Sequence, residues 1–215
     1  WPDRAEAASG VVHVIPSFDR AAMQIEADLL IEWYLPAMTG APASAAQRKE
    51  YWTHWSAIFD RLEAVAEHTL MQRDYHSPNI IWRPERSGRD RLGLVDFQDA
   101  LIGPSAYDLA SLAMDARVTI SPELERRTVD AYIAARERSG AFSRAAFEEA
   151  YAIMAAQRNA KILGIFVRLD RRDGKPAYLK HLPRIRGYFR RALEHPALSG
   201  LRSFAETNGL LREAT

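Results

Sequence analysis

Asp74, Asn79 and Asp96 carry side-chain oxygens of the kind that bind hard metal cations. The first two stand in the segment LMQRDYHSPNIIW, residues 70–82, where polar residues interrupt two apolar runs. A polar group between apolar segments costs free energy unless something satisfies it, so this segment needs a chemical explanation. Magnesium takes oxygen ligands, often only one or two from the protein, and phosphate oxygens and water supply the rest. The three residues therefore suit a magnesium–nucleotide site if the fold brings them together.

A β-hairpin is predicted to bring them together. NIIW and LGLVDF are short β-type runs, and the RPERSGRDR segment between them contains turn-forming Pro, Ser and Gly. Folding the chain about this turn predicts that Arg83 lies opposite Leu92 and that Asn79 lies opposite Asp96. Directly opposed residues have Cβ atoms roughly 5 Å apart. Asn79 and Asp96 are thus expected to meet at the open end of the hairpin, with Asp74 just before it.

The rest of the chain shows mainly helical periodicity. One helix is expected over residues 18–35, and a second runs from a capping box at Ser44 and Gln47 to about His68. Their predicted apolar faces comprise Ala22, Ile25, Leu29 and Trp33 in the first helix and Tyr51, Trp55, Ile58, Leu62 and Val65 in the second. Further helices are expected over residues 105–116, 122–139, 143–170, 176–195 and 200–212, with Pro183 kinking or splitting one of them. The predicted fold class is mainly α with a small embedded β-hairpin.

Composition excludes several functional classes. The 215 residues are 47% hydrophobic and 27% charged, which suits a globular chain with a sizeable core. A net charge of +1 gives no global reason to expect nucleic acid or a membrane surface as a partner. The chain has no cysteine, which excludes disulfides and thiolate chemistry and favours a reducing compartment. No apolar run approaches the roughly 18 residues of a membrane span, so a cytoplasmic protein is expected.

The motifs resemble those of a known family. QRDYHSPN followed by LVDFQDALIGPSAYDLASL is similar to the paired signatures of the aminoglycoside phosphotransferase and choline kinase group, relatives of the protein kinases. The matching residues are Arg73, Asp74 and Asn79 in the first signature and Asp96 and Phe97 in the second, while Gln72 and Gln98 stand where kinases have His and Gly. Together with QRNAKILGIFVRLDRRDGK, these elements resemble bacterial cell-wall amino sugar kinases in particular, which phosphorylate N-acetylmuramate and N-acetylglucosamine at the anomeric hydroxyl. The resemblance covers about residues 18–190.

This resemblance implies roles for the three oxygen-bearing residues. Asp74 would accept or orient the proton of the sugar hydroxyl, and Asn79 and Asp96 would hold Mg²⁺ that bridges the phosphates of ATP. ATP and Mg²⁺ are therefore the expected cofactors. The alternative for Asp74 is a turn carboxylate that bonds nearby amides. The joint spacing of the three residues favours the functional reading.

Four further residues near the loop are expected either to support its structure or to bind a ligand. Arg73 is expected to support the loop, and the resemblance implies that Asp108 braces the loop backbone, although Asp108 could also cap local amides of its own helix. His76 either packs under the loop, which is favoured, or touches substrate. Asp99 is equally suited to be a second metal or substrate ligand and to cap the turn before Gly103-Pro104.

A cationic stripe is predicted between residues 157 and 175. It consists of Arg158, Lys161, Ile165, Arg168 and Arg172, which share one helical face, whereas Ile162, Phe166 and Leu169 form another. Arginine clusters bind carboxylates, and a muramate carries a lactyl carboxylate, so Arg158, Lys161 and Arg168 are candidate substrate residues. The pattern alone favours a solvated face, and the family resemblance reverses that preference. Trp33, Tyr34, Trp52 and Trp55 could stack on a sugar ring, but core packing is favoured.

Two parts of a complete kinase are not visible in the sequence. A glycine-rich phosphate loop is missing because no two of the eleven glycines form G-x-G, and no lysine lies in a β-type run ahead of Asp74. The chain also begins at Trp1 rather than Met. Residues 1–215 are therefore expected to be a kinase-like C-terminal lobe whose partners are ATP, a small-molecule sugar and its own missing N-terminal lobe. The isolated chain is expected to be inactive or weakly active.

The leading hypothesis is the catalytic and substrate-binding lobe of an ATP-dependent sugar kinase. A second reading, within the same fold, is a kinase that acts on an aminoglycoside, choline or homoserine; the arginine stripe argues against a cationic substrate. A third reading is a non-catalytic helical binding module. The complete set of Asp74, Asn79 and Asp96 speaks against that one.

Overall fold

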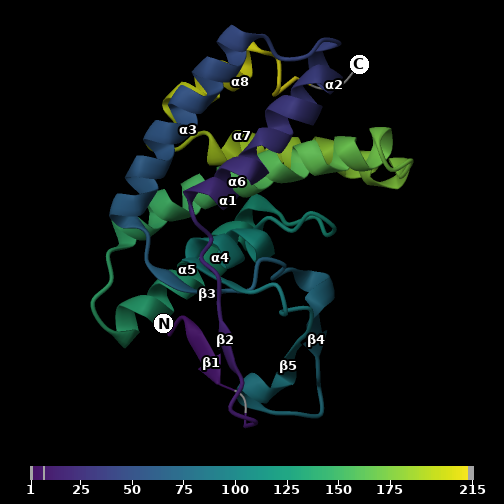
Figure 1. Ribbon diagram of the computed structural model, residues 1–215. Coiled ribbons are helices and arrows are strands. Elements are labelled where there is room, and N and C mark those ends of the chain that lie inside the picture. Colours follow the sequence, from purple (N-terminus) through teal and green to yellow (C-terminus); the bar gives the residue numbers. More distant parts are fainter. Residues whose placement is uncertain (1, 7, 213–215) are drawn as a thin grey trace. The chain divides into compact units, whose positions relative to one another are not determined.

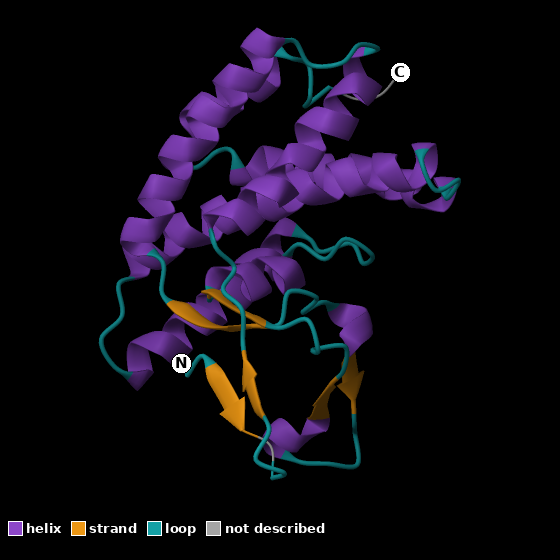
Figure 2. Cartoon of the chain, in the orientation of Figure 1, coloured by secondary structure: helices purple, strands orange, loops and turns teal. Residues whose placement is uncertain are grey.

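A computed structural model describes residues 2–6 and 8–212 as helices with three small two-stranded antiparallel sheets (Figures 1 and 2). The predicted mainly helical fold class with a small embedded β-hairpin is confirmed. The chain divides into a mixed unit, residues 1–19 and 67–142, and a helical unit, residues 20–66 and 143–215. All the strands described belong to the mixed unit. No helix among the described residues has the length and apolarity that a bilayer span requires.

The mixed unit contains paired strands followed by two helices. The pairs are β1 (Arg4–Glu6) with β2 (Val12–Val14), β3 (His68–Met71) with β6 (Leu101–Pro104), and β4 (Ile80–Trp82) with β5 (Leu92–Leu94). Helices α4 (Ala106–Ala113) and α5 (Pro122–Ser139) follow β6. Only the β4–β5 hairpin was predicted. The other strands are three or four residues long.

The β3–β6 pair fixes the start of the polar loop. Strand β3 ends at Met71, which is fully buried, and β6 is bonded on its other side to the segment that contains Ser17. Gly103 of β6 lets these elements approach closely, because a Cβ there would lie 3.0 Å from Cβ of Phe18 and 3.1 Å from Sδ of Met71. The Phe18 ring packs edge-on against Tyr107 of α4 at 5.3 Å. This packing anchors the chain immediately before residue 72.

The predicted register of the hairpin is wrong by one residue. Ile80 pairs with Leu94 and Trp82 with Leu92, so the residue that continues the ladder opposite Asn79 is Val95 rather than Asp96. Arg83 likewise donates its backbone N–H to Arg91 rather than lying opposite Leu92. A shift of one residue turns a side chain to the other face of a strand. The apolar pattern could not detect the shift because residues on both faces of this hairpin are exposed or half-buried.

The helical unit is built around one long helix. Its elements are α1 (Arg20–Leu29), a π-helical turn (Leu30–Tyr34), α2 (Leu35–Thr39), α3 (Ala45–Val65), α6 (Arg144–Arg171), α7 (Leu182–Ala192) and α8 (Ser199–Thr207). The capping box of Ser44 and Gln47 is confirmed at the start of α3. Pro183 splits the predicted 176–195 helix, because it lies in the first turn of α7 and a 3₁₀ segment, Pro176–His181, precedes it.

The predicted apolar face of the first helix is wrong. Ile25 is 69% exposed, whereas the charged residue Glu26 is only 7% exposed. Glu26 is buried because it pairs with Lys161 of α6 at 2.6 Å and accepts a hydrogen bond from Gln157 at 3.1 Å. A buried ion pair needs such additional hydrogen bonds to offset its desolvation. Hydrophobic periodicity cannot predict a face that contains a buried charge.

Gly164 of α6 is required by the contact between α6 and α1. A Cβ at this position would lie 2.1 Å from the carbonyl oxygen of Leu29, which is shorter than any non-bonded contact. We predict that Gly164→Ala lowers the free energy of unfolding by about 3 kcal/mol, because a packed interface must move apart. Urea unfolding followed by tryptophan fluorescence measures the change.

Gly187 of α7 provides the matched control. A Cβ at Gly187 would meet no atom within 4 Å, so Gly187→Ala should leave the stability unchanged or raise it by up to about 1 kcal/mol through helix propensity. Equal unfolding free energies for Gly164→Ala and the unmodified protein would contradict the close approach of the two helices.

Candidate functional site

The backbone of the loop after β3 is held by a carboxylate from α4. The Oδ2 and Oδ1 atoms of Asp108 accept hydrogen bonds from the backbone N–H groups of Gln72 and Arg73, at 2.7 and 3.0 Å. Arg73 has a φ of 66°, a left-handed conformation that a non-glycine residue adopts only at a cost. The two hydrogen bonds stabilise this turn. They also show that Asp108 braces the loop backbone, the role that the resemblance implies.

Asn79 and Asp96 meet despite the register shift. Asp96 has a φ of 62°, and this left-handed turn at the end of β5 brings its side chain to Asn79. The Nδ2 atom of Asn79 donates to Oδ2 of Asp96 at 3.2 Å and to the backbone oxygen of Asp74 at 3.0 Å. Gln98, which stands where kinases have Gly, donates to Oδ1 of Asp96 at 2.8 Å. The three residues singled out first are therefore joined by hydrogen bonds at one end of the hairpin.

This donor set fits a magnesium ion that also binds phosphates. The amide nitrogen of Asn79 faces Asp74 and Asp96, which leaves its Oδ1 atom as the remaining ligand atom. Asp96 is exposed and supplies carboxylate oxygens. Among the described residues no group of three or more acidic or His side chains could hold a metal by itself. One amide and one carboxylate match the few protein ligands that Mg²⁺ takes when phosphate and water complete its shell.

The carboxylate of Asp74 is exposed. Its backbone N–H bonds to Gln72 and its backbone oxygen accepts from His76, so the main chain of Asp74 is fixed on both sides. The side chain itself is free to reach a ligand in solvent. Such a group can accept a proton from a hydroxyl placed next to it.

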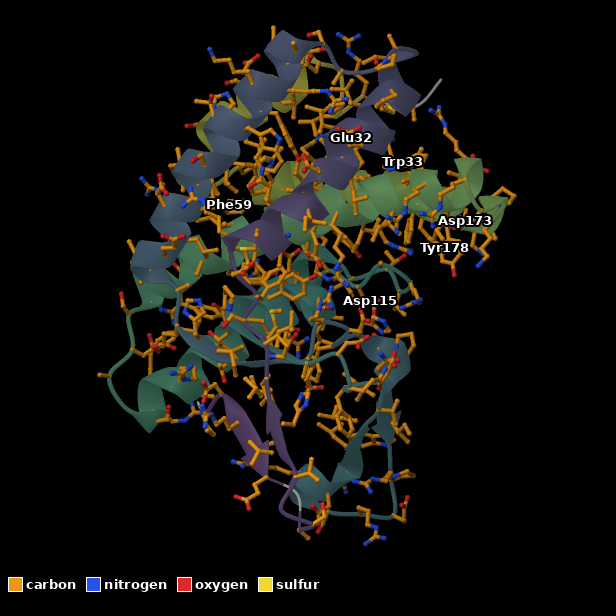
Figure 3. The ribbon with its side chains drawn as sticks, viewed as in Figure 1. Glu32, Trp33, Phe59, Asp115, Asp173 and Tyr178 are labelled. Atoms are coloured by element: carbon orange, nitrogen blue, oxygen red, sulfur yellow. The ribbon has the colours of Figure 1, made fainter. Side chains whose placement is uncertain are left out.

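Asp115 is a second brace of the loop that the sequence analysis missed. This side chain, labelled in Figure 3, is fully buried just beyond the end of α4. It accepts hydrogen bonds from the backbone N–H groups of Ser77 at 2.8 Å and Arg117 at 2.7 Å. Burial by itself would raise the pKa of Asp115, but hydrogen bonds from Ser77, Arg117 and Val118 outweigh it and lower the pKa. Asp115 is therefore an ionised, buried anchor.

A sequence signal for Asp115 did exist. Asp115 follows Asp108 by seven residues in the apolar stretch YDLASLAMDA, so the two carboxylates fall on the same helical face. A charge that recurs on one face of an otherwise apolar helix needs a partner, because an unpaired buried charge is costly. Asp108 and Asp115 both accept hydrogen bonds from backbone N–H groups of the loop 72–79.

The remaining candidates of the mixed unit are placed as follows. His76 is 6% exposed and its ring lies beside Arg117, so it packs under the loop. Arg73 is half-buried. Asp99 is exposed, and its side chain makes no hydrogen bond or ion pair within the part of the chain that is described. Gly103-Pro104, which Asp99 was expected to precede as a cap, lies in strand β6 instead of a turn.

Three predicted substrate residues belong to α6 in the helical unit. Arg158 is 5% exposed, and Lys161 is engaged by Glu26 in a largely buried ion pair. Arg168 is half-buried, and Arg172 pairs with Asp173 at 2.6 Å. The predicted cationic stripe is therefore neither continuous nor fully solvated. In the first half of the stripe, Arg158 is buried and Lys161 is paired with Glu26.

The aromatic side chains mostly form the core of the helical unit. Trp55 and Tyr34 are 0% and 1% exposed, as core packing predicts. Trp33 and Trp52 are half-buried. Trp33, labelled in Figure 3, lies in the π-helical turn, where Tyr34 rather than Trp33 occupies the buried face.

The fold is protein-kinase-like. A solved structure of a choline/ethanolamine kinase family protein from Mesorhizobium loti superposes with a TM-score of 0.53 over 94% of this chain and 62% of that chain, at 15% sequence identity. At this identity the likeness concerns the fold alone.

The chain belongs to the phosphotransferase enzyme family, which matches residues 8–146. It is similar to an N-acetylmuramate/N-acetylglucosamine kinase of Caulobacter vibrioides, with 39% identity over 188 residues, 87% of this chain and 50% of that protein. Proteins of the same name from Neisseria meningitidis and Pseudomonas putida are 34% and 32% identical over 83% and 87% of this chain. The chain spans about half the length of these curated relatives.

Replacing Asp115 tests the second brace. We predict that Asp115→Asn speeds amide hydrogen exchange at Ser77 and Arg117 and destabilises the mixed unit by about 2 kcal/mol, since a charged acceptor of three backbone N–H groups is lost. Because the folded-state pKa of Asp115 is lowered, its stabilisation is present above the ordinary pKa of about 4 and is lost as the pH falls through the lower folded value.

The difference between Asp115→Asn and the unmodified protein should therefore shrink in acid. Asp90→Asn, a change of an exposed carboxylate in the same unit, is the control and should leave exchange at Ser77 unaltered. Unchanged exchange at Ser77 in Asp115→Asn would rule out the brace.

Proposed function

We propose that this chain forms the catalytic and substrate-binding lobe of an ATP-dependent phosphotransferase that phosphorylates the anomeric hydroxyl of N-acetylmuramate or N-acetylglucosamine. The observation that carries the proposal is the hydrogen-bonded group of Asp74, Asn79 and Asp96 on a loop that Asp108 and Asp115 hold in place. Family membership supports the phosphoryl transfer, and the names of the relatives support the sugar substrates. Such a kinase would serve the recycling of cell-wall amino sugars in the cytoplasm.

Asp74 is the proposed catalytic residue. Its fixed main chain and exposed carboxylate would orient the sugar hydroxyl and accept its proton as the oxygen attacks the transferring phosphoryl group. Phosphoryl transfer depends mainly on positioning, so the two carboxylates that immobilise the loop backbone contribute through Asp74. Asp108 and Asp115 are thus positioning residues in this proposal.

Asn79 and Asp96 are the proposed magnesium ligands. The ion would supply positive charge to the phosphates of ATP. The hydrogen bonds from Asn79 to the backbone of Asp74 and to Asp96 couple the proposed metal ligands to the proposed base. This coupling supports the proposal that the metal ligands and the base act as one group.

Exposed apolar side chains beside this group suit the base of a nucleotide. Ile81, Val95 and Phe97 are 49%, 42% and 59% exposed. Val95 follows the hairpin ladder opposite Asn79, and Ile81 lies two residues along the same face of β4. A further lobe would complete the nucleotide site, in keeping with relatives about twice as long, and the 215-residue chain alone is proposed to have little or no activity.

The reaction itself is tested on the polypeptide as its gene encodes it. With ATP and Mg²⁺, we expect transfer of the γ-phosphoryl group to both amino sugars, detected as sugar 1-phosphate by phosphorus NMR. Asp74→Asn should lower kcat by roughly 10²–10⁴-fold with little change in KM, since the proton acceptor is lost but the binding surface is kept. A variant that retained most of its kcat would refute the assigned role of Asp74.

The metal ligands are tested separately on the 215-residue protein. Titration with paramagnetic Mn²⁺ in place of Mg²⁺ should broaden the amide NMR signals of residues near 79 and 96. Asp96→Asn should weaken this binding at least about tenfold, because a neutral amide replaces the carboxylate of the pair. Asp90→Asn serves as the control with an equal charge change. Broadening centred elsewhere in the chain would argue against the assigned ligands.

A further inference from the structure

Arg117 lies beside the catalytic loop with its guanidinium held by a buried histidine. It belongs to the segment that follows α4, three residues beyond Met114 at the end of that helix. Its Nη1 atom is within hydrogen-bonding distance of Nε2 of His76, and His76 is only two residues from Asp74 along the loop. The backbone N–H of His76 also bonds to the oxygen of Asp74 at 3.0 Å.

The contact between Arg117 and His76 fixes which side chain donates the hydrogen bond. A guanidinium keeps its proton and can only donate, so Nε2 of His76 must accept. Because His76 is only 6% exposed, a buried side chain holds the guanidinium of Arg117 in position.

Asp115 fixes the same segment through the main chain. Its Oδ1 atom accepts from the backbone N–H groups of Arg117 at 2.7 Å and Val118 at 3.2 Å, while its Oδ2 atom accepts from Ser77 at 2.8 Å. One carboxylate therefore ties the turn that carries Arg117 to the loop that carries Asp74. Both the backbone and the side chain of Arg117 are positioned relative to the catalytic loop.

The positive charge of Arg117 is not balanced by a carboxylate of the described residues. Arg117 is exposed, and within residues 2–6 and 8–212 no carboxylate forms an ion pair with its guanidinium. Arg136 of the same unit differs in this respect, because it pairs with Glu67 at 2.9 Å. An oriented, uncompensated guanidinium presents a planar fork that matches a carboxylate.

We propose that Arg117 is a specificity-determining residue that binds a carboxylate on the sugar substrate and so favours acidic amino sugars over neutral ones. The inference rests on the proposed function and extends it from a substrate class to a substrate preference. N-Acetylmuramate carries a lactyl carboxylate that N-acetylglucosamine lacks. These two sugars therefore form a matched pair that isolates the contribution of Arg117.

The test measures both sugars on the polypeptide as its gene encodes it. Arg117→Ala should lower kcat/KM for N-acetylmuramate by roughly three- to tenfold through KM and leave kcat/KM for N-acetylglucosamine unchanged. Arg117→Lys, which keeps the charge but loses the fork, should fall between the two. Arg127→Ala removes an exposed arginine from α5 and should change neither sugar.

An equal loss for both sugars would overturn the proposal, because it would assign Arg117 to loop structure or to the phosphoryl group. Calorimetric binding of each sugar without ATP separates this proposal from the proposed function. If neither sugar is phosphorylated, the proposed function fails. The binding preference for N-acetylmuramate must still disappear in Arg117→Ala, and a preference that persists there, or is absent from the unmodified protein, would refute the role of Arg117.

Discussion

Two carboxylates that accept backbone N–H groups from one loop are the constraint on which the site depends. Asp108 bonds the start of the loop and Asp115 bonds its end, so a segment with a left-handed turn at Arg73 is held at both sides. Both carboxylates come from α4 or the residues directly after it. The geometry of the loop is therefore set by the packing of one apolar helix.

A second constraint is the left-handed conformation of Asp96. The ladder of the hairpin places Val95 opposite Asn79, and a regular continuation of β5 would turn the next side chain to the other face. The positive φ of Asp96 reverses this, and the carboxylate meets the amide of Asn79. Strained residues of this kind are typical of functional sites, where the surrounding contacts hold them in place.

The helical unit shows a different use of charge. Glu26 and Lys161 form a largely buried pair that Gln157 completes, close to the point where Gly164 allows α6 to approach Leu29 of α1. A pair of this kind specifies which faces of two helices meet. The same residues explain why a stripe that looks cationic in the sequence is partly internal.

The sequence by itself determined the helices with strong caps and the existence of the hairpin, and it singled out Asp74, Asn79 and Asp96 as candidates. Capping, turn residues and motif spacing are local properties. Tertiary structure decided the hairpin register, the buried face of α1 and the role of Asp115. Each of these depends on a contact between residues distant in the chain: a left-handed turn against a facing strand, a buried ion pair between two helices, and a carboxylate that reaches 38 positions back to the amide of Ser77. A one-dimensional pattern records the polarity of such residues but not the partner that satisfies them.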